Sequence, residues 1–311
     1  MKDTLPNFLL VGAAKSGTTS LYRYLNGHPE IFMSAIKEPL FFTLDSYKRI
    51  SRNDPRHNVA DKKMARMATL EDYQKLFEEV SDQHKAIGEA SAPYLYHYDM
   101  AISGIKKTLE DPKILIILRN PIERAFSSYN HLLAEGAESV SFERFLENEA
   151  QKKRENWDIL NYPVSAGMYY LQVKAYQEHF SRVKVILLDD LKDRPSDVLR
   201  ELFEFLDVRV EFSPDTSKVY NKTARSLNGT TGSTLAAKMF SDKNYLKVII
   251  RKTLGLFLSR QKLSSLGRKG RALVARKPQI SSRTRQRLRQ EFAEDILNLQ
   301  TLISRDLSSW T

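Results

Sequence analysis

Short apolar runs alternate along the chain with amphipathic stretches, and this order predicts strands and helices in turn. Asn7–Gly12 is an apolar run that ends in glycine, which is typical of a buried strand. Lys113–Leu118 is an equally clear run, and Ala86–Glu89 and Val183–Leu188 are weaker ones. Strands that alternate with helices favour an α/β fold, in which helices cover both faces of a central parallel sheet.

Apolar residues at helical spacing lie between and after these runs. Helices are predicted at Gly17–Asn26, from Pro121 to about Leu133, at Ser196–Leu206 and at Arg283–Ile303. Proline suits the first turn of a helix, where its missing N–H costs nothing. The sequence has no internal repeat, low-complexity linker or clear boundary, so we expect a single domain over residues 1–311.

Composition narrows the class of protein. With 311 residues, of which 41% are hydrophobic, the chain can form a packed core unaided. It has no cysteine, which excludes disulfides, thiolate metal sites and cysteine nucleophiles. No run approaches the roughly 18 apolar residues that span a bilayer, and the first residues lack the pattern of a signal peptide. We therefore expect a soluble, cytoplasmic protein.

The net charge of +11 is concentrated in one segment. Residues 236–277 hold 12 lysines and arginines against one acid, and the rest of the chain has 37 basic and 37 acidic residues. A local basic block indicates an anionic partner near it and not general nucleic-acid binding. Within this helical basic extension, 245–258 has an apolar face bordered by cations. A docked helix is the favoured interpretation, with a lid over an acceptor site or a peripheral membrane contact as alternatives.

The loop Gly12–Thr19, between the first strand and the first helix, carries the main chemical signal. Small residues let the backbone approach an anion, and the free N–H groups at a helix start attract it. Lys15 adds a positive charge, and three hydroxyl side chains add donors. A Walker A loop would need Gly-Lys-Ser/Thr after four spacer residues. Here the lysine precedes Gly17 by two positions, so the loop is P-loop-like but unlike that of a magnesium-nucleotide hydrolase.

A second signal follows the strand Lys113–Leu118. The segment Arg119–Tyr129 reads Arg-Asn-Pro-Ile-Glu-Arg-Ala-Phe-Ser-Ser-Tyr. Together with the Lys-x-Gly-Thr-Thr loop, it resembles the two anion-binding motifs of the sulfotransferases that use 3′-phosphoadenosine 5′-phosphosulfate (PAPS). The motifs stand in the family's order, roughly 100 residues apart, and each lies at a strand-to-helix junction.

Three further segments resemble the carbohydrate and bacterial branch of that family. Lys37–Phe42 (Lys-Glu-Pro-Leu-Phe-Phe) is similar to its Lys-Glu-x-x-Phe-Phe segment. Gly88–Tyr94 and Gly167–Tyr169 also fall where that branch has related segments. The resemblance runs from about Asn7 to Leu206 and implies a sulfotransferase domain.

The resemblance also implies roles for the matching residues. Arg119 and Ser127 would hold the 3′-phosphate that distinguishes PAPS from ATP, and a guanidinium fork suits phosphate chemically. Lys222 and Arg225 lie in a later loop that would close over the same phosphate. The 5′-phosphosulfate would be enclosed by Lys15, Ser16, Gly17, Thr18 and Thr19.

Sulfuryl transfer requires charge stabilisation on the leaving oxygen and a base for the acceptor proton. Lys15 is the expected stabiliser. Glu38 is the expected base, because glycan sulfotransferases place a catalytic glutamate before the Phe-Phe pair. His131, one turn beyond Ser127, is the one histidine worth watching as an alternative, although a helix-surface role is the simpler interpretation. Ala90 stands where the glycan enzymes usually carry a lysine, which weakens the acceptor assignment.

The predicted reaction needs no metal, and its acceptor would be an intracellular sugar, glycolipid headgroup or small natural product. Oxygen and nitrogen acceptors are not separated by the sequence. A P-loop kinase of a small molecule is one alternative, and it would need an acidic magnesium ligand such as the pair Asp189-Asp190. A non-catalytic anion- or membrane-binding relative is the other, and the intact set of Lys15, Glu38, Arg119 and Ser127 argues against it.

Overall fold

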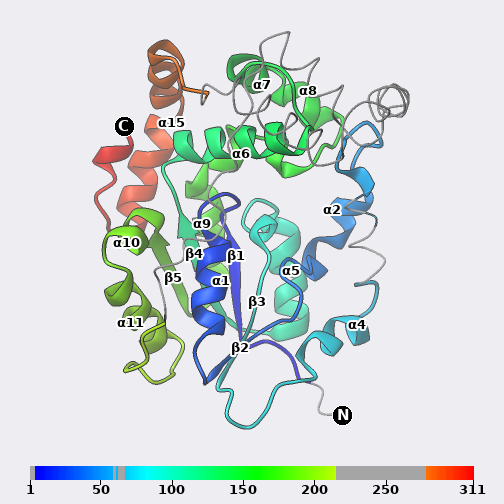
Figure 1. Cartoon of the computed structure of the whole chain (residues 1–311), viewed down its shortest axis with the longest axis vertical. Helices are drawn as coiled ribbons and strands as arrows, with labels where there is room; N and C mark the ends of the chain where they lie inside the picture. The colour runs from blue at the N-terminus through cyan, green and yellow to red at the C-terminus, as the bar shows by residue number, and fades with distance from the viewer. Residues whose placement is uncertain (1–3, 59–60, 62–66, 215–277) are drawn as a thin grey trace, which may run out of the picture.

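One parallel sheet organises the part of the chain that the computed structural model describes, residues 4–58, 61, 67–214 and 278–311 (Figure 1). Its strand order is β2-β3-β1-β4-β5, and every neighbouring pair is parallel. The strands are β1 (Phe8–Gly12), β2 (Ile31–Met33), β3 (Ala86–Ala90), β4 (Lys113–Leu118) and β5 (Val183–Leu187). Because all of them run the same way, the loops that follow β1, β3 and β4 meet at one edge of the sheet.

Helices cover both faces of this sheet. The described helices are α1 (Thr18–Asn26), α2 (Leu44–Lys48), α4 (Leu70–Gln74), α5 (Tyr98–Leu109), α6 (Pro121–Glu135), α7 (Phe142–Glu147), α8 (Glu149–Arg154), α9 (Tyr169–His179), α10 (Leu188–Asp193), α11 (Pro195–Phe205) and α15 (Ser282–Ile303). The α1 and α11 helices pack against one face, and α5 and α9 pack against the other.

The alternation of side chains along β4 builds a core on each side. Ile114, Ile116 and Leu118 point to the α5 and α9 side, while Leu115 and Ile117 point to the α1 and α11 side. All five are essentially without exposed surface. Burial of each stabilises the fold by about 1.5–3 kcal/mol relative to an exposed side chain. The continuous apolar run in the sequence is therefore the signature of a strand buried on both faces.

The C-terminal helix α15 lies against α9 and α6 (Figure 1). Its buried side chains join the core on the α5 and α9 side, and they are Leu288, Phe292, Ile296 and Leu299. Trp310, at the end of the chain, is buried in the same core. Residues 282–311 thus add to the core on the face of the sheet that α5 and α9 cover.

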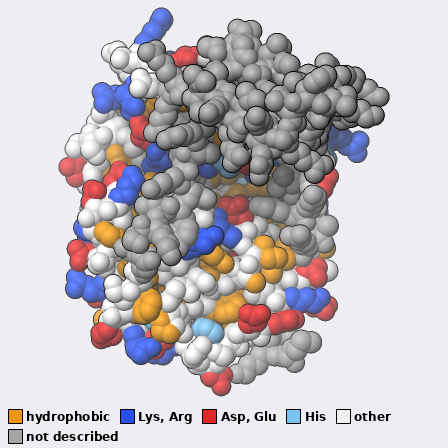
Figure 2. All heavy atoms as spheres, viewed as in Figure 1, with side chains coloured by type: hydrophobic (Ala, Val, Ile, Leu, Met, Phe, Trp, Pro, Cys, Tyr) orange, Lys and Arg blue, Asp and Glu red, His pale blue; other side chains and the backbone are white. Residues whose placement is uncertain are grey.

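The four predicted strands and four predicted helices are confirmed within a few residues at each end. Strand β2 was not predicted, because it has only three residues and follows Pro29 without a longer apolar run. Residues 236–277, including the predicted helix 245–258, lie outside the described residues. On the face of the molecule seen in Figure 2, acidic and basic side chains of the described residues are interspersed.

Candidate functional site

The phosphate loop joins the end of β1 to the start of α1 in a conformation shaped by its backbone. Lys15 and Gly17 have φ angles of 69° and 96°, in the left-handed region. Glycine adopts that region freely, and a side chain at Gly17 would also meet Leu188 Cδ1 at 2.6 Å. A Cβ at Gly12 would meet Leu95 Cβ at 2.4 Å. Both glycines are therefore required by the local packing.

The start of α1 leaves polar groups available for an anion. Gly17 is the N-cap and has no side chain to cap the helix, so the first-turn N–H groups, including those of Thr18 and Thr19, have no side-chain cap. Ser16 is fully buried, and its hydroxyl lies within hydrogen-bonding reach of Tyr169. Backbone N–H groups without a side-chain cap at a helix start fit a phosphate or sulfate group.

Arg119 follows β4 and reaches the phosphate loop. Its Nη1 donates to the carbonyl oxygen of Lys15 at 3.3 Å, and Tyr169 donates its hydroxyl hydrogen to the carbonyl oxygen of Arg119 at 3.0 Å. Glu123 is a looser neighbour, 3.9 Å from Nη2, and it pairs at 2.9 Å with Arg285. The structure thus brings together two motifs that lie 104 residues apart.

Helix α6 starts as its sequence predicts and carries Ser127 in its second turn. Pro121 occupies the first turn, and the Asn120 side chain caps the helix by accepting from the N–H groups of Ile122 and Glu123. Ser127 is 8% exposed. Arg124, on the same helix, is fully buried and donates to the backbone carbonyls of the Tyr162–Pro163 segment, so it has a structural partner.

Lys15 lies among charges from several segments. Burial lowers the pKa of its ammonium group to about 8, while the carboxylates of Glu38 and Glu135 oppose this shift and the guanidinium of Arg56 adds to it. Glu38 follows β2 and Glu135 ends α6. The expected base and the expected stabiliser of the leaving oxygen are therefore close enough for their charges to interact.

The loop that carries Glu38 is held against the end of β3. The Glu38 N–H donates to the carbonyl oxygen of Ala90 at 2.8 Å. Both Glu38 and Leu40 have left-handed φ angles, 59° and 63°. Such conformations cost about 1–3 kcal/mol each in residues other than glycine, and they persist only where the surroundings fix them. Glu38 Oε1 is 3.0 Å from Lys37 Nζ, and the Glu38 side chain is 31% exposed, so it is accessible to an acceptor.

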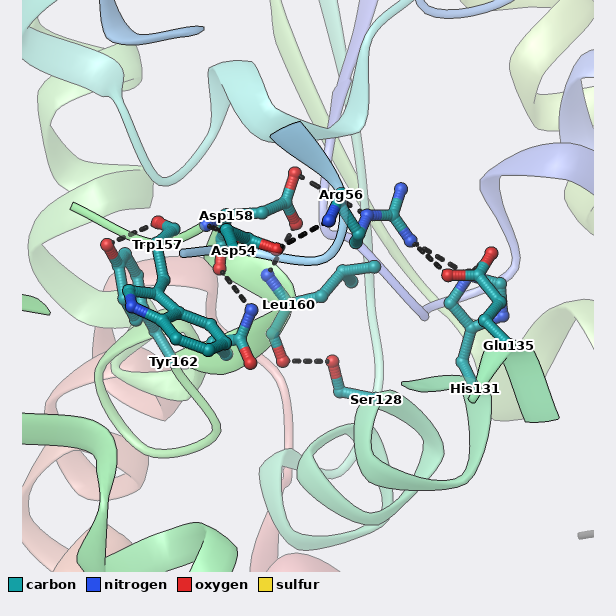
Figure 3. A network of polar contacts seen from close by, with 10 residues as sticks. Asp54, Arg56, Ser128, His131, Glu135, Trp157, Asp158, Leu160 and Tyr162 are labelled. Carbon is teal, nitrogen blue, oxygen red and sulfur yellow. Dashed lines mark hydrogen bonds and ion pairs between the residues drawn. The ribbon is translucent and has the colours of Figure 1, made fainter. Parts of the chain in front are cut away.

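A cluster that sequence reasoning missed surrounds Arg56 (Figure 3). Its Nη1 lies 2.7 Å from Glu135 Oε2 and 3.5 Å from His131 Nε2, and its Nε lies 3.9 Å from Asp158 Oδ2. Asp54 accepts from the backbone N–H groups of both Arg56 and Asp158. The guanidinium therefore links α6 to the segment that precedes Tyr162.

His131 belongs to the same cluster around Arg56. Its Nε2 lies 3.2 Å from Glu135 Oε1. Burial lowers the pKa of His131, the Lys15 charge lowers it further, and the Glu135 carboxylate opposes both effects. A helix-surface role alone does not describe this residue. Glu135 could have been found from the sequence, because it lies four positions after His131 on the same helix face, whereas Arg56 lies in no motif.

Two points from the sequence concern the lysine that is missing at Ala90 and the later loop with Lys222 and Arg225. Ala90 has no exposed surface and packs in the core beside α1, so the site has no lysine there. Lys37 contacts Glu38 instead, and Arg56 supplies a second cation to the cluster. Lys222 and Arg225 lie outside the described residues.

Among residues 4–58, 61, 67–214 and 278–311, no group of three His, Asp or Glu side chains could hold a metal ion. In those ranges no helix has the length and apolar character needed to cross a bilayer.

The fold and the site define a class of protein. A parallel sheet with a glycine-containing loop between its central strand and a helix, and with cationic side chains along the carboxyl edge, is a P-loop-like α/β fold, an arrangement that suits an anionic ligand. The sequence profile described as "Sulfotransferase domain" matches residues 5–248. The chain belongs to the sulfotransferase domain family.

Individual relatives agree with this assignment. The chain is 29% identical over 257 residues to carbohydrate sulfotransferase 15 of Rattus norvegicus, in a match that covers 66% of this chain and 44% of that protein. It is 27% identical over 245 residues to bifunctional heparan sulfate N-deacetylase/N-sulfotransferase 1 of Caenorhabditis elegans, covering 74% of this chain and 26% of that protein. The chain thus spans less than half the length of these two curated relatives.

A solved structure matches along the whole chain. The crystal structure of a sulfotransferase from Alicyclobacillus acidocaldarius is 32% identical in sequence and superposes with a TM-score of 0.74. The match covers 99% of this chain and 99% of the other. The resemblance drawn from the two anion-binding motifs is confirmed at the level of the family and the fold.

Proposed function

We propose that the protein is an enzyme that transfers a sulfuryl group from PAPS to a hydroxyl or amine of an acceptor. The observation that carries this proposal is the contact between Arg119 and the phosphate loop, at the carbonyl of Lys15. Ser127 lies on the helix that follows Arg119. This arrangement supports two neighbouring anion sites. PAPS would fill both, one with its 5′-phosphosulfate and the other with its 3′-phosphate, a group that ATP lacks.

The residues present fit PAPS. The uncapped start of α1 would hold the 5′-phosphosulfate, with Lys15, Ser16, Gly17, Thr18 and Thr19 around it. Arg119 and Ser127 would hold the 3′-phosphate, and we propose that Lys222 and Arg225 add to this site. Bound PAPS supplies an activated sulfuryl group, and 3′-phosphoadenosine 5′-phosphate (PAP) is the remaining product.

Two side chains would carry the chemistry. Glu38 is accessible and is the proposed base that takes the proton from the acceptor. Lys15 would stabilise the charge that develops on the leaving oxygen, since a cation in a buried site acts more strongly than one in water. Its lowered pKa still leaves it mostly protonated near pH 7. The cluster of Arg56, His131 and Glu135 would position these groups.

The proposal also covers the class of acceptor and the cellular location of the enzyme. Relatives named carbohydrate sulfotransferase and heparan sulfate N-sulfotransferase support a sugar, a glycolipid headgroup or a small natural product. We propose a cytoplasmic enzyme, and for its basic segment 236–277 a docked helix stays the favoured interpretation, with a lid over the acceptor site or a membrane contact as alternatives. We also propose that residues 1–311 form one domain, because α15 and Trp310 share the core of the sheet.

The kinase alternative finds little support at its expected magnesium site. Asp190 Oδ2 lies 2.7 Å from Arg305 Nη2 and 3.6 Å from Arg194 Nη2. Asp189 pairs with Lys192 at 2.7 Å. Both carboxylates are thus engaged by cations of the chain itself, which favours the sulfotransferase over a magnesium-dependent kinase.

Turnover of PAPS tests the proposal. The protein is incubated with PAPS and a panel of sugars, glycolipids and phenols, and PAP formation is followed. We expect acceptor-dependent PAP formation that falls by about 10²–10³-fold in Lys15→Ala and is unchanged in Lys48→Ala, an exposed lysine paired with Asp45. Equal PAP formation in Lys15→Ala and the parent would contradict the mechanism, and transfer from ATP with magnesium in place of PAPS would establish the kinase.

A further inference from the structure

Glu89 is a buried acidic residue at the carboxyl end of β3 to which the proposed reaction gives no role. It has no exposed surface, so it cannot contact an acceptor. Its Oε2 accepts a hydrogen bond from Ser91 Oγ at 3.0 Å, and the hydroxyls of Tyr73 and Tyr94 also hydrogen-bond to the carboxyl group. Burial of a carboxyl group costs free energy unless hydrogen bonds compensate for the lost water. The partners of Glu89 therefore indicate what the residue does in the fold.

Ser91 connects Glu89 to the loop that carries the base. A serine hydroxyl has one hydrogen, and here it is donated to Glu89. The oxygen of the same hydroxyl accepts from the Leu40 N–H at 3.1 Å. The Glu38 N–H donates to the carbonyl oxygen of Ala90. The end of β3 therefore holds the backbone on both sides of residue 39.

Tyr94 and Tyr73 add contacts to the hydrogen bonds that hold the Glu38 loop against the end of β3. The Tyr94 hydroxyl accepts from the Phe42 N–H at 3.3 Å, which fixes the next turn of the loop. The buried Tyr73 hydroxyl lies beside the Glu89 carboxyl group, and it hydrogen-bonds to it as the hydroxyls of Ser91 and Tyr94 do. Burial raises the pKa of Glu89 to about 7, against the opposing effect of the neighbouring hydroxyls. The charged and titratable groups that face Glu89 are Lys37, Tyr73, Tyr94 and Tyr176.

We propose that Glu89 is a positioning residue, which orients Ser91 and thereby fixes the loop that presents Glu38. This inference rests on the proposed function, because Glu38 is the base there. The loop needs an external anchor, since Glu38 and Leu40 both adopt left-handed conformations that residues other than glycine avoid. The anchor requires a hydrogen-bond acceptor at position 89, because the Ser91 hydroxyl must point its hydrogen there.

Kinetics separate positioning from a general structural role. Glu89→Gln keeps an acceptor oxygen at the same distance from the backbone, and Glu89→Leu removes it. We expect kcat to fall by about 10- to 100-fold in Glu89→Leu, as for a reacting group displaced by a fraction of an ångström to one ångström. Glu89→Gln should stay within about threefold of the parent. The affinity for PAP should be unchanged in both, because the phosphate loop and Arg119 lie on other strands.

A double-mutant cycle identifies the residue through which Glu89 acts. In a Glu38→Gln background, Glu89→Leu should cause no further loss of kcat, since the group that it positions is already absent. Full additivity of the two losses, or an equal kcat loss in Glu89→Gln and Glu89→Leu, overturns the proposal. If Glu89→Leu does not fold, Ser91→Ala removes the same link and takes its place.

Amide hydrogen exchange gives a readout that does not depend on sulfuryl transfer. In Glu89→Leu the amides of residues 36–43 should exchange faster than in the parent and in Glu89→Gln, while those of β4 stay protected. Glu30→Leu is the matched control, since Glu30 is a largely buried carboxylate that precedes β2 at the opposite edge of the sheet. It should leave residues 36–43 unchanged. Unchanged exchange in Glu89→Leu would sink the positioning role, whereas absence of transfer by the parent would sink only the proposed function.

Discussion

The proposed donor half and the proposed acceptor half of the site are built in different ways. The donor half is made of two continuous segments, Lys15–Thr19 and Arg119–Ser127, which lie just after the central strands β1 and β4. The acceptor half combines Glu38, Arg56 and Asp158, from three separate segments, with His131 and Glu135 of α6. The first half is fixed by strand ends and helix starts, and the second by contacts between side chains.

The charge balance of the two halves differs as well. The donor half presents Lys15 and Arg119, and both are buried enough for their pKa values to be lowered. In the acceptor half the cations are already paired, as Lys37 is with Glu38 and Arg56 is with Glu135. The donor half should therefore determine affinity for an anionic ligand, with Lys15 acting on the rate as well, while the acceptor half should affect the rate of transfer alone. Variants on the two sides test this separation.

The largest effect on rate alone is expected for Glu38→Gln. The amide cannot take a proton, so kcat with the best acceptor should fall by about 10²–10⁴-fold, while the dissociation constant for PAP, measured by calorimetry, stays at the parent value. Glu178→Gln, an exposed glutamate on α9, is the matched control. A larger loss of kcat in His131→Gln than in Glu38→Gln would transfer the role of base to the histidine.

A smaller effect is expected for Arg56→Gln. Loss of the guanidinium leaves Glu135 and Asp158 without their shared cation, and we expect kcat to fall on the order of tenfold, equivalent to about 1.4 kcal/mol. The pKa of His131, followed by NMR, should rise because Arg56 lowers it in the parent. The exposed Arg49 provides the control variant, Arg49→Gln. Unchanged kcat and an unchanged His131 titration together would remove Arg56 from the site.

The smallest effect is a change in the pH profile. Only protonated Lys15 stabilises the leaving oxygen, and burial lowers its pKa to about 8. The value of kcat/KM for PAPS, which reports groups of the free enzyme, should therefore decline as the pH rises above about 8. In Lys15→Arg the decline should move to higher pH, because a guanidinium stays charged. A decline that persists at pH 8 in Lys15→Arg would assign it to another group.

The strands and helices that carry the proposed donor half could be predicted because their sequence signals are local. A strand, a small-residue loop and a helix start occupy consecutive positions, and Pro121 marks the start of α6 without reference to the rest of the fold. Arg119 contacts Lys15 because β1 and β4 are parallel neighbours, so that the residues after both strands meet at the same edge of the sheet.

The acceptor half could not be predicted to the same extent. Arg56 is one of 49 basic residues, and only the fold places it against α6 and Asp158. Glu89 is visible in the sequence, but its burial and its link to Leu40 through Ser91 depend on the pairing of distant segments. Lys222, Arg225 and the basic segment 236–277 stay predictions.

Calorimetric titration with PAP and, separately, with ATP and magnesium tests whether the site is built for a 3′-phosphorylated ligand. The parent should bind PAP more tightly than ATP with magnesium, and Arg119→Ala should lose this preference, because the 3′-phosphate loses its guanidinium partner. Arg200→Ala, an exposed arginine on α11, should keep it. Equal or tighter binding of ATP by the parent, or a full preference for PAP in Arg119→Ala, would contradict the account.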